Sequence, residues 1–272
     1  MRDLGIEFIS VFGLPPVDFV HLAADLGCRY ISTALAGRPL KSLKSLGYQE
    51  FSLKDDARLR QHLLTAMDDR GVSISLGEGM VIVPDADVSG LAPDLDVMAE
   101  LRVAQINTLS FDRDRNRTFD QLATLTEMAA ERGMGTTIEL APGMTIGDPA
   151  TVLAAIEHVG RPDLRLTVDT MHWARSGYGA VELYKLGPEK IGYVQLSDTT
   201  LKARAKSYLQ EAMYERMIPG DGELPLAEML AAAPGDVVIG LEIPMRGLAE
   251  SGVGPMDRLR PCVAAARELC NR

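Results

Sequence analysis

The amino-acid sequence predicts a single-domain α/β protein with the (β/α)8 fold, the TIM barrel. The chain has 272 residues, which is close to the usual size of such a barrel. Short apolar segments rich in Val, Ile and Thr alternate along it with longer helical patterns, as parallel α/β proteins require. Eight segments of this kind occur, at residues 5–11, 29–34, 72–76, 105–110, 135–140, 165–169, 191–196 and 237–243. Because no linker interrupts the alternation, we expect one domain over residues 1–272.

The segments between these strands carry helical signals. In 118–132, apolar residues recur at helical spacing, and Thr118 with Gln121 matches the pattern of a capping box at the start of a helix. Asp148 and Pro149 are residue types that helices prefer at the N-cap and at the first helical position. The sequence therefore predicts strands and helices in regular alternation.

Composition and charge exclude several classes of protein. With 46% hydrophobic and 24% charged residues, the chain can bury a large core. A net charge of -10 argues against a general nucleic-acid binder and against binding to an acidic membrane surface. The N-terminal residues lack a signal-peptide pattern, and no apolar run reaches the length of a membrane span. The three cysteines form no CxxC pair, so we expect reduced thiols and a cytoplasmic protein.

Three of the expected loops are long, at residues 35–53, 77–91 and 199–223. In a (β/α)8 barrel the active site lies at the C-terminal ends of the strands, and the long loops at that end select the substrate. We therefore expect a small-molecule substrate to bind there. Long loops on one face are also compatible with a homodimer.

Four strand-like segments in the second half of the chain end on residues that can bind a metal. These residues are Glu139, Asp169, Gln195 and Glu242. In a parallel barrel they would point at one spot, and three carboxylates with an amide oxygen suit Mn²⁺ or Mg²⁺ better than Zn²⁺. Each residue alone could instead make a salt bridge at the polar barrel mouth, but four at successive strand ends favour a metal site.

Two further side chains belong near this site. His172 follows Asp169 by three residues, so it would lie just past the end of its strand and could bind the metal, support a ligand or contact the substrate. The alternative is an ordinary hydrogen-bonded loop histidine. Glu78 follows the third strand and would either line the substrate pocket or cap the barrel rim.

A basic segment in this acidic chain suggests an anionic substrate. It contains Lys202, Arg204, Lys206 and Arg216. A guanidinium binds carboxylate or phosphate groups bidentately, so Arg216 is the best single substrate-binding residue, with Arg246 as a weaker second one.

The same segment has another interpretation. Leu209, Met213 and Met217 recur at helical spacing, which predicts a helix that packs these side chains inward. The lysines would then belong to a solvated face with no specific role.

With these residues in view, the chain resembles the xylose-isomerase-like barrel superfamily, which includes sugar-phosphate isomerases and epimerases and the apurinic endonucleases. The resemblance runs over the whole chain. Its most specific pieces are Asp169-Thr-Met-His172 and Pro219-Gly-Asp-Gly-Glu223, and Ile-Glu139-Leu, Tyr-Val-Gln195-Leu-Ser-Asp198 and Leu-Glu242-Ile also match.

The resemblance implies roles for these residues. Glu139, Asp169, Gln195 and Glu242 would bind the metal, and His172 and Arg216 would contact the substrate. Many members of the superfamily have histidine where this chain has Gln195, whereas the glutamine is similar to metal-dependent 3-dehydroshikimate dehydratases and inosose dehydratases. The chain lacks the histidine-rich loops of the multi-zinc endonucleases, so DNA repair is disfavoured.

The chemistry common to the related enzymes is proton abstraction next to a carbonyl, with a metal that stabilises the enolate. Reprotonation on the other face gives an epimer, reprotonation on the neighbouring carbon gives an isomer, and loss of a β-hydroxyl gives a dehydrated product. We expect a metal-dependent isomerase or epimerase acting on a sugar or polyol-like substrate, with Glu139 or Glu242 as the base and His172 as a second catalytic group. A dehydratase is the first alternative, and a non-catalytic binding protein is the second.

Overall fold

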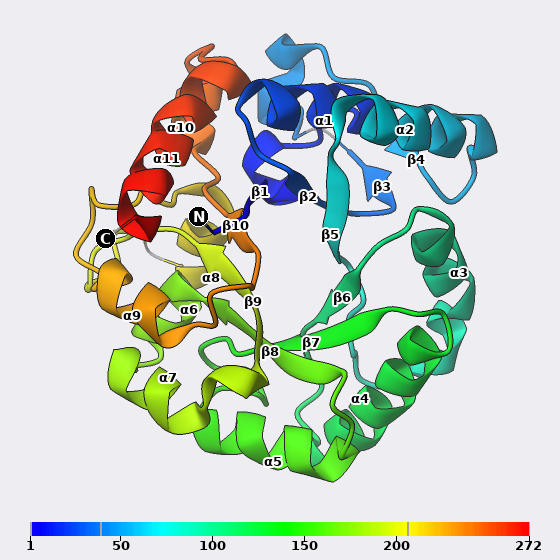
Figure 1. Ribbon diagram of the computed structural model, residues 1–272, viewed down its shortest axis with the longest axis vertical. Helices are drawn as coiled ribbons and strands as arrows, with labels where there is room; N and C mark the ends of the chain where they lie inside the picture. Colours follow the sequence, from blue (N-terminus) through cyan, green and yellow to red (C-terminus); the bar gives the residue numbers. More distant parts are fainter. Residues whose placement is uncertain (1, 39, 206, 272) are drawn as a thin grey trace.

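The structure, a computed structural model, describes residues 2–38, 40–205 and 207–271. Its centre is a closed barrel with the strand order β1-β10-β9-β8-β7-β6-β5-β2, and all neighbouring strands run parallel (Figure 1). The predicted (β/α)8 barrel fold is therefore confirmed. In chain order, the barrel strands are β1 (Leu4–Ile6), β2 (Tyr30–Thr33), β5 (Ser73–Gly77), β6 (Gln105–Thr108), β7 (Gly135–Glu139), β8 (Leu164–Asp169), β9 (Ile191–Leu196) and β10 (Ile239–Leu241).

Helices connect the strands and form a ring outside the barrel (Figure 1). The α-helices are α1 (Pro16–Asp25), α2 (Ala57–Arg70), α3 (Ala92–Glu100), α4 (Arg115–Ala130), α5 (Pro149–Val159), α6 (Thr170–Arg175), α7 (Ala180–Leu186), α8 (Tyr208–Tyr214), α9 (Leu226–Ala232), α10 (Arg246–Glu250) and α11 (Pro255–Cys270). Short 3-10 helices are η1 (Phe8–Val11), η2 (Lys41–Leu46), η3 (Val88–Leu91) and η4 (Pro188–Lys190), and strands β3 (Ala36–Gly37) and β4 (Phe51–Ser52) form a small antiparallel pair. Among the described residues, none of the helices combines the length and the apolar character that crossing a bilayer requires.

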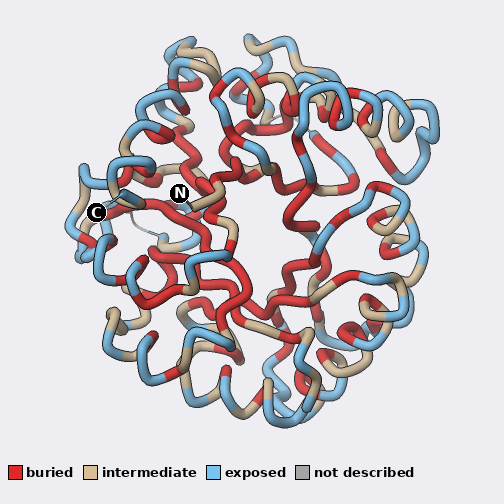
Figure 2. Tube along the Cα trace, viewed as in Figure 1, coloured by how far each residue is buried: buried red, intermediate tan, exposed pale blue. Residues whose placement is uncertain are grey.

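The core has two layers, one inside the barrel and one between the barrel and its helices. Figure 2 shows buried residues along the strands and exposed residues on the outer faces of the helices. Strand β9 illustrates the reason, because all of its residues are buried: alternate side chains point into the barrel and toward the surrounding helices. Strands of this kind appear in the sequence as nearly continuous apolar runs, which is why they could be located.

The first strand is shorter than predicted. The sequence indicates a strand over 5–11, but β1 ends at Ile6 and η1 follows. In η1, the Ser10 hydroxyl donates to the Leu241 carbonyl (2.9 Å) and accepts from the Ile243 amide (2.8 Å). The chain turns after Ile6, and the hydrogen bonds of Ser10 hold η1 against the end of β10, the strand that pairs with β1.

The helix caps agree with the sequence in one place and differ in another. Asp148 caps α5 as predicted, because its side chain accepts the backbone N–H of Thr151 (2.8 Å). The predicted capping box at Thr118 is wrong: α4 begins one turn earlier, at the N-cap Asp114, and Thr118 is buried inside the helix with its hydroxyl 2.8 Å from that of Ser110.

Candidate metal centre and active site

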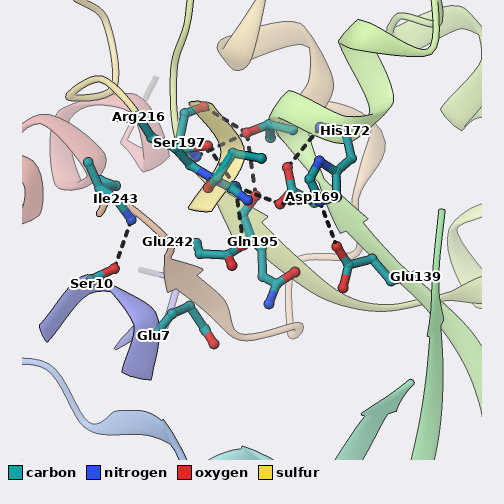
Figure 3. A network of polar contacts seen from close by, with 12 residues as sticks. Glu7, Ser10, Glu139, Asp169, His172, Gln195, Ser197, Arg216, Glu242 and Ile243 are labelled. Atoms are coloured by element: carbon teal, nitrogen blue, oxygen red, sulfur yellow. Dashed lines mark hydrogen bonds and ion pairs between the residues drawn. The ribbon is translucent and has the colours of Figure 1, made fainter. Parts of the chain in front are cut away.

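The four predicted metal ligands converge at the C-terminal end of the barrel. Glu139 and Asp169 are the last residues of β7 and β8, Gln195 pairs in register with Asp169, and Glu242 directly follows β10. All four are buried. Because the ends of parallel strands meet at one edge, these side chains from four segments surround a single opening (Figure 3).

Arg216 lies between two of these carboxylates. Its Nη1 is 2.6 Å from Asp169 Oδ2 and 3.1 Å from Glu242 Oε2, while its Nε donates to the Ala212 carbonyl (2.8 Å). The guanidinium itself is buried. The arginine predicted to bind an anionic substrate is therefore paired with two carboxylates of its own chain, and a further anion would compete with them.

These ion pairs separate the acidities of the two carboxyl groups. Burial alone would raise the pKa of Asp169, but the positive charges of Arg216 and His172 hold that pKa well below its ordinary value. Burial raises the pKa of Glu242 well above its ordinary value; Arg216 opposes this, and the charges of Asp169 and Glu139 add to it. Without a bound cation, Asp169 is therefore the more acidic of the two carboxyl groups and Glu242 the less acidic.

His172 is held against the same carboxylates by the start of α6. Asp169 caps this helix and accepts the backbone N–H of His172 (2.9 Å). The imidazole Nε2 lies 3.2 Å from Glu139 Oε1 and 3.8 Å from Asp169 Oδ2, and Nδ1 hydrogen-bonds the Tyr208 hydroxyl. Glu139 Oε2 accepts from the Asn107 amide (2.7 Å). Glu139, Asp169 and His172 each offer one ligand atom within 4.8 Å of the others, so this cluster can hold a metal ion.

A buried carboxylate that sequence reasoning missed lies on the opposite side of the opening. Glu7 follows β1, and its Oε1 accepts from the Tyr193 hydroxyl (2.7 Å), which is 3.0 Å from the Ser75 hydroxyl. Burial raises the pKa of Glu7, although hydrogen bonds from neighbouring polar groups oppose the shift. An acidic residue directly after a strand was the available signal, but the prediction of one strand over 5–11 placed Glu7 in its middle.

Glu78 joins this second group to the first. It follows β5, lines the cavity as one of the two predicted alternatives, and accepts a hydrogen bond from Gln195 Nε2 at 3.3 Å. Burial raises the pKa of Glu78 well above its ordinary value, and the charges of Glu7 and Glu139 raise it further. Gln195 therefore uses its nitrogen toward Glu78 and keeps its oxygen for another partner.

A glycine makes room for the Glu7 side chain. A Cβ atom on Gly240, in the middle of β10, would lie 1.6 Å from Glu7 Oε1 and 2.7 Å from the Tyr193 hydroxyl. No side chain fits at that separation, so the Glu7 carboxylate inside the barrel depends on a glycine in the neighbouring strand.

The site opens into a cavity of about 630 Å³. Its polar lining includes Glu7, Glu78, Glu139, His172, Gln195, Arg216 and Glu242, and Arg38, Ser207, Tyr208 and Tyr214 also contribute. Arg246, the predicted second substrate-binding arginine, is not among the described residues that line it. Its Nε lies 3.6 Å from Glu215 Oε1, and its guanidinium stacks on the ring of Tyr214 at 4.6 Å.

One aspartate organises the long loop over 199–223. Asp198 Oδ2 accepts the backbone N–H groups of Gly220 (2.9 Å) and Gly222 (3.1 Å), and Oδ1 accepts those of Thr199 (2.8 Å) and Leu224 (3.2 Å). This explains the Pro-Gly-Asp-Gly motif physically, because the chain must pass close to a buried carboxylate. The carboxylate fixes both ends of the loop.

Within this loop, the helix predicted around Leu209 exists as α8, but it presents a different face. Leu209 and Met213 line the cavity and are exposed, so the prediction that they pack inward is wrong. Glu211 is the buried side chain instead, and it pairs with Arg175 (2.7 Å) and Arg204 (3.6 Å). Lys206 lies outside the described residues.

The unsatisfied polar atoms of the site are a physical test for a metal. Gln195 Oε1 is buried without a hydrogen-bond partner, and so is Glu7 Oε2. A buried acceptor without a donor costs about 1–3 kcal/mol unless a water or an ion satisfies it. Five carboxyl groups here face one buried arginine and one histidine. The oxygen-rich donor set fits a divalent cation, which would satisfy the amide oxygen and compensate the excess negative charge.

Comparisons with known proteins agree with this geometry. Residues 20–262 match the xylose isomerase-like TIM barrel family, so the chain belongs to that family. No curated protein sequence matches the chain.

Solved structures with the same fold include enzymes of several kinds. An IolI protein with a bound zinc atom has a TM-score of 0.79 at 15% identity, covering 100% of this chain and 98% of that one. A probable 3-DHS dehydratase, AsbF from Bacillus anthracis, has a TM-score of 0.74 at 15% identity and 99% coverage of both chains. A D-psicose 3-epimerase determined with D-fructose has a TM-score of 0.68 at 16% identity and 100% coverage of both. At these identities the likeness concerns the fold.

Proposed function

We propose that this protein is a metal-dependent enzyme that removes the proton next to a carbonyl group of a small hydroxy-carbonyl compound. Its reaction is the isomerisation or epimerisation of a sugar or polyol-like substrate. The observation that carries the proposal is the convergence of Glu139, Asp169, Gln195 and Glu242 at one end of the barrel, where all but Asp169 line the cavity and Gln195 Oε1 is left without a partner. The family and the epimerases among its structural neighbours support it.

Glu139, Asp169, Gln195 and Glu242 would hold the metal, as predicted from the sequence. Four oxygen donors favour Mn²⁺ or Mg²⁺ over Zn²⁺. When bound, the cation supplies a Lewis acid that polarises a substrate oxygen and favours loss of the adjacent proton.

The protein's own groups would move the proton. Glu139 and Glu242 lie on either side of the opening in Figure 3, so one can take a proton from one face of the substrate while the other returns it to the opposite face. His172 contacts Glu139 and donates to the substrate, and Arg216 and Glu78 complete the polar lining. This division of roles accounts for epimerisation with a single pair of carboxyl groups.

The test is deuterium uptake from D2O into a ketose, measured by mass spectrometry on the Mn²⁺-loaded protein. We expect Glu139→Gln to slow uptake by about 10²–10⁴-fold, the usual contribution of a general base. The control is Glu131→Gln, because Glu131 is exposed at the end of α4.

Calorimetric titration with Mn²⁺, Mg²⁺ and Zn²⁺ separates loss of the base from loss of the metal. Full turnover by Glu139→Gln with metal bound would exclude Glu139 as the base. If no metal binds and no ketose exchanges, a non-catalytic binding protein on the same fold becomes the better interpretation.

Gln195 favours a dehydratase as the second candidate. The resemblance described for the sequence likens a glutamine at this position to the dehydratases, and the chain shares its fold with a probable 3-DHS dehydratase. Dehydroshikimate is the substrate to test, because its dehydration creates an aromatic product whose ultraviolet absorbance can be followed directly. Formation of that chromophore, faster than with any ketose, would replace the isomerase proposal with the lyase.

A further inference from the structure

The cavity has two chemically different parts. Its floor, at the strand ends, carries the carboxyl groups, Gln195 and His172 described above. Its walls and mouth are mainly apolar, although Arg38, Ser207, Tyr208 and Tyr214 also line the cavity, and the apolar side chains come from several separate segments: Phe12, Leu109, Phe111, Met144, Leu209 and Met213. A sugar would place hydroxyl groups against those walls and lose their hydrogen bonds to water without replacement. The walls therefore suit a substrate that is not polar all round.

The apolar mouth remains exposed to water. Phe111 is 46% exposed, Leu209 is 61% exposed and Met213 is 38% exposed, and all three line the cavity. They come from the loop after β6 and from α8, so segments distant in the sequence bring large apolar side chains to one opening. Apolar groups gathered at a cavity mouth mark a binding surface, because folding leaves them uncovered.

The buried cation of the cavity, Arg216, is already paired. Arg38 and Arg216 are the arginines among the described residues that line the cavity. Arg216 binds Asp169 and Glu242, while Arg38 lies at the surface with its Nε 3.9 Å from Glu50 Oε2. A carboxylate or phosphate at the strand ends would have to displace Asp169 or Glu242 from Arg216. The pairing of this arginine therefore favours an uncharged head group.

We propose that the natural substrate is an uncharged amphipathic hydroxy ketone. Its hydroxy-carbonyl head lies at the strand ends, and a hydrocarbon chain or ring lies against Phe111, Leu209 and Met213. The assignment of the head group rests on the proposed function, whereas the apolar body rests on the walls and the mouth alone. The cavity, at about 630 Å³, has the size of sites that enclose ligands larger than a simple sugar.

The experiment compares 1-hydroxy-2-butanone, 1-hydroxy-2-hexanone and 1-hydroxy-2-octanone with dihydroxyacetone and D-fructose on the Mn²⁺-loaded protein. Calorimetry gives the dissociation constants, and deuterium uptake from D2O reports proton abstraction. We expect affinity to rise roughly fourfold for each methylene added, since a buried methylene contributes about 0.8 kcal/mol. Binding of the octanone should also show a negative heat-capacity change.

Two variants with matched controls test where the hydrocarbon chain of the ligand binds. Phe111→Ser and Leu209→Ser should reduce the gain per methylene, while Tyr184→Ser and Val181→Ser should leave it unchanged. The control residues are exposed large apolar side chains as well, at 58% and 59%, but they belong to α7 and do not line the cavity. Far-ultraviolet circular dichroism shows whether each variant is folded.

The outcomes separate this inference from the proposed function. Dissociation constants that do not depend on chain length, or binding of D-fructose as tight as that of the octanone, would overturn the inference, and so would no binding by any member of the series. The same holds if Leu209→Ser changes only the sedimentation of a dimer, because a second copy of the chain would then cover the mouth. Binding that strengthens with the length of the hydrocarbon chain but gives no deuterium uptake would support an amphipathic ligand and refute the proposed enzymatic function.

Discussion

The two halves of the barrel mouth handle buried charge differently. At the ends of β7 to β10, Asp169 and Glu242 share Arg216, and Glu139 faces His172. At the ends of β1 and β5, the side chains that donate hydrogen bonds to Glu7 and Glu78 are neutral among the described residues, and they include the Tyr193 hydroxyl and the Gln195 amide. The first half is a preformed set of charges, whereas the second needs a proton or a bound cation to be stable. Removal of charge should therefore have opposite effects in the two halves.

The largest effect is expected from Arg216→Ala. It leaves two buried carboxylates without their counter-charge, which should lower the free energy of unfolding of the metal-free protein by about 3–5 kcal/mol. Mn²⁺ should restore part of this loss if the carboxylates bind it. Urea denaturation with and without Mn²⁺ measures both quantities.

Arg246→Ala is the control for that variant. Arg246 makes two long ion pairs and stacks on Tyr214 at a partly exposed position, so its removal should cost about 1 kcal/mol. Equal losses for the two arginine variants would show that the charged half is not organised around Arg216.

A smaller effect, about 1–3 kcal/mol, is expected when Gly240→Ala overfills the other half. The new methyl group would meet the Glu7 carboxylate, so Glu7→Ala in the same background should recover part of the loss. Thermal denaturation of the two single variants and the double variant gives the coupling energy. Gly90→Ala is the matched control, because a Cβ there meets open space. Strict additivity would contradict the steric account.

The smallest effect is a slope in stability with pH. A buried carboxyl group with a raised pKa binds its proton more tightly in the folded chain, so its contribution is lost as pH rises above the ordinary value of 4.5. Asp169 acts oppositely, because its lowered pKa removes stability only as pH falls below 3.8. We expect the metal-free protein to lose stability from mildly acidic pH upward, by at most about 1.4 kcal/mol per pH unit for each group.

Glu7→Gln should flatten this slope, as urea denaturation at a series of pH values would reveal. If the slope is unchanged in Glu7→Gln, the second half is compensated by some other charge. A stability that rises with pH throughout the neutral range would contradict the prediction for the whole group.

The apolar strand segments of the sequence predict both the barrel and the charged residues at the ends of β7 to β10. Strands buried on both faces produce long apolar runs, and a polar residue at the end of such a run, such as Glu139 or Asp169, stands out. Because parallel strands end on one side, four such residues must lie together once the fold is known. The convergence on one cavity thus follows from local pattern and topology.

In the other half the sequence predicts Glu78, which follows a strand, but not Glu7, because the position of Glu7 depends on tertiary contacts. Strand β1 has three residues, and the turn after it is set by the contact of Ser10 with β10, so Glu7 carried no clear strand-end signal. Helical spacing around Leu209 predicts a helix but not which face is buried; the ion pairs of Glu211 with two arginines decide that. The pairing of Arg216 with Asp169 joins residues 47 positions apart in the chain.

The Asp198 carboxylate has a consequence for how this protein can be redesigned. It holds both ends of the segment 199–223 within one buried set of hydrogen bonds, so these ends are fixed independently of helix α8. Helix α8 is therefore the exchangeable part of the segment: a graft that keeps Asp198, the two glycines and Arg216 can introduce a new α8, and with it a new mouth, without rebuilding the scaffold.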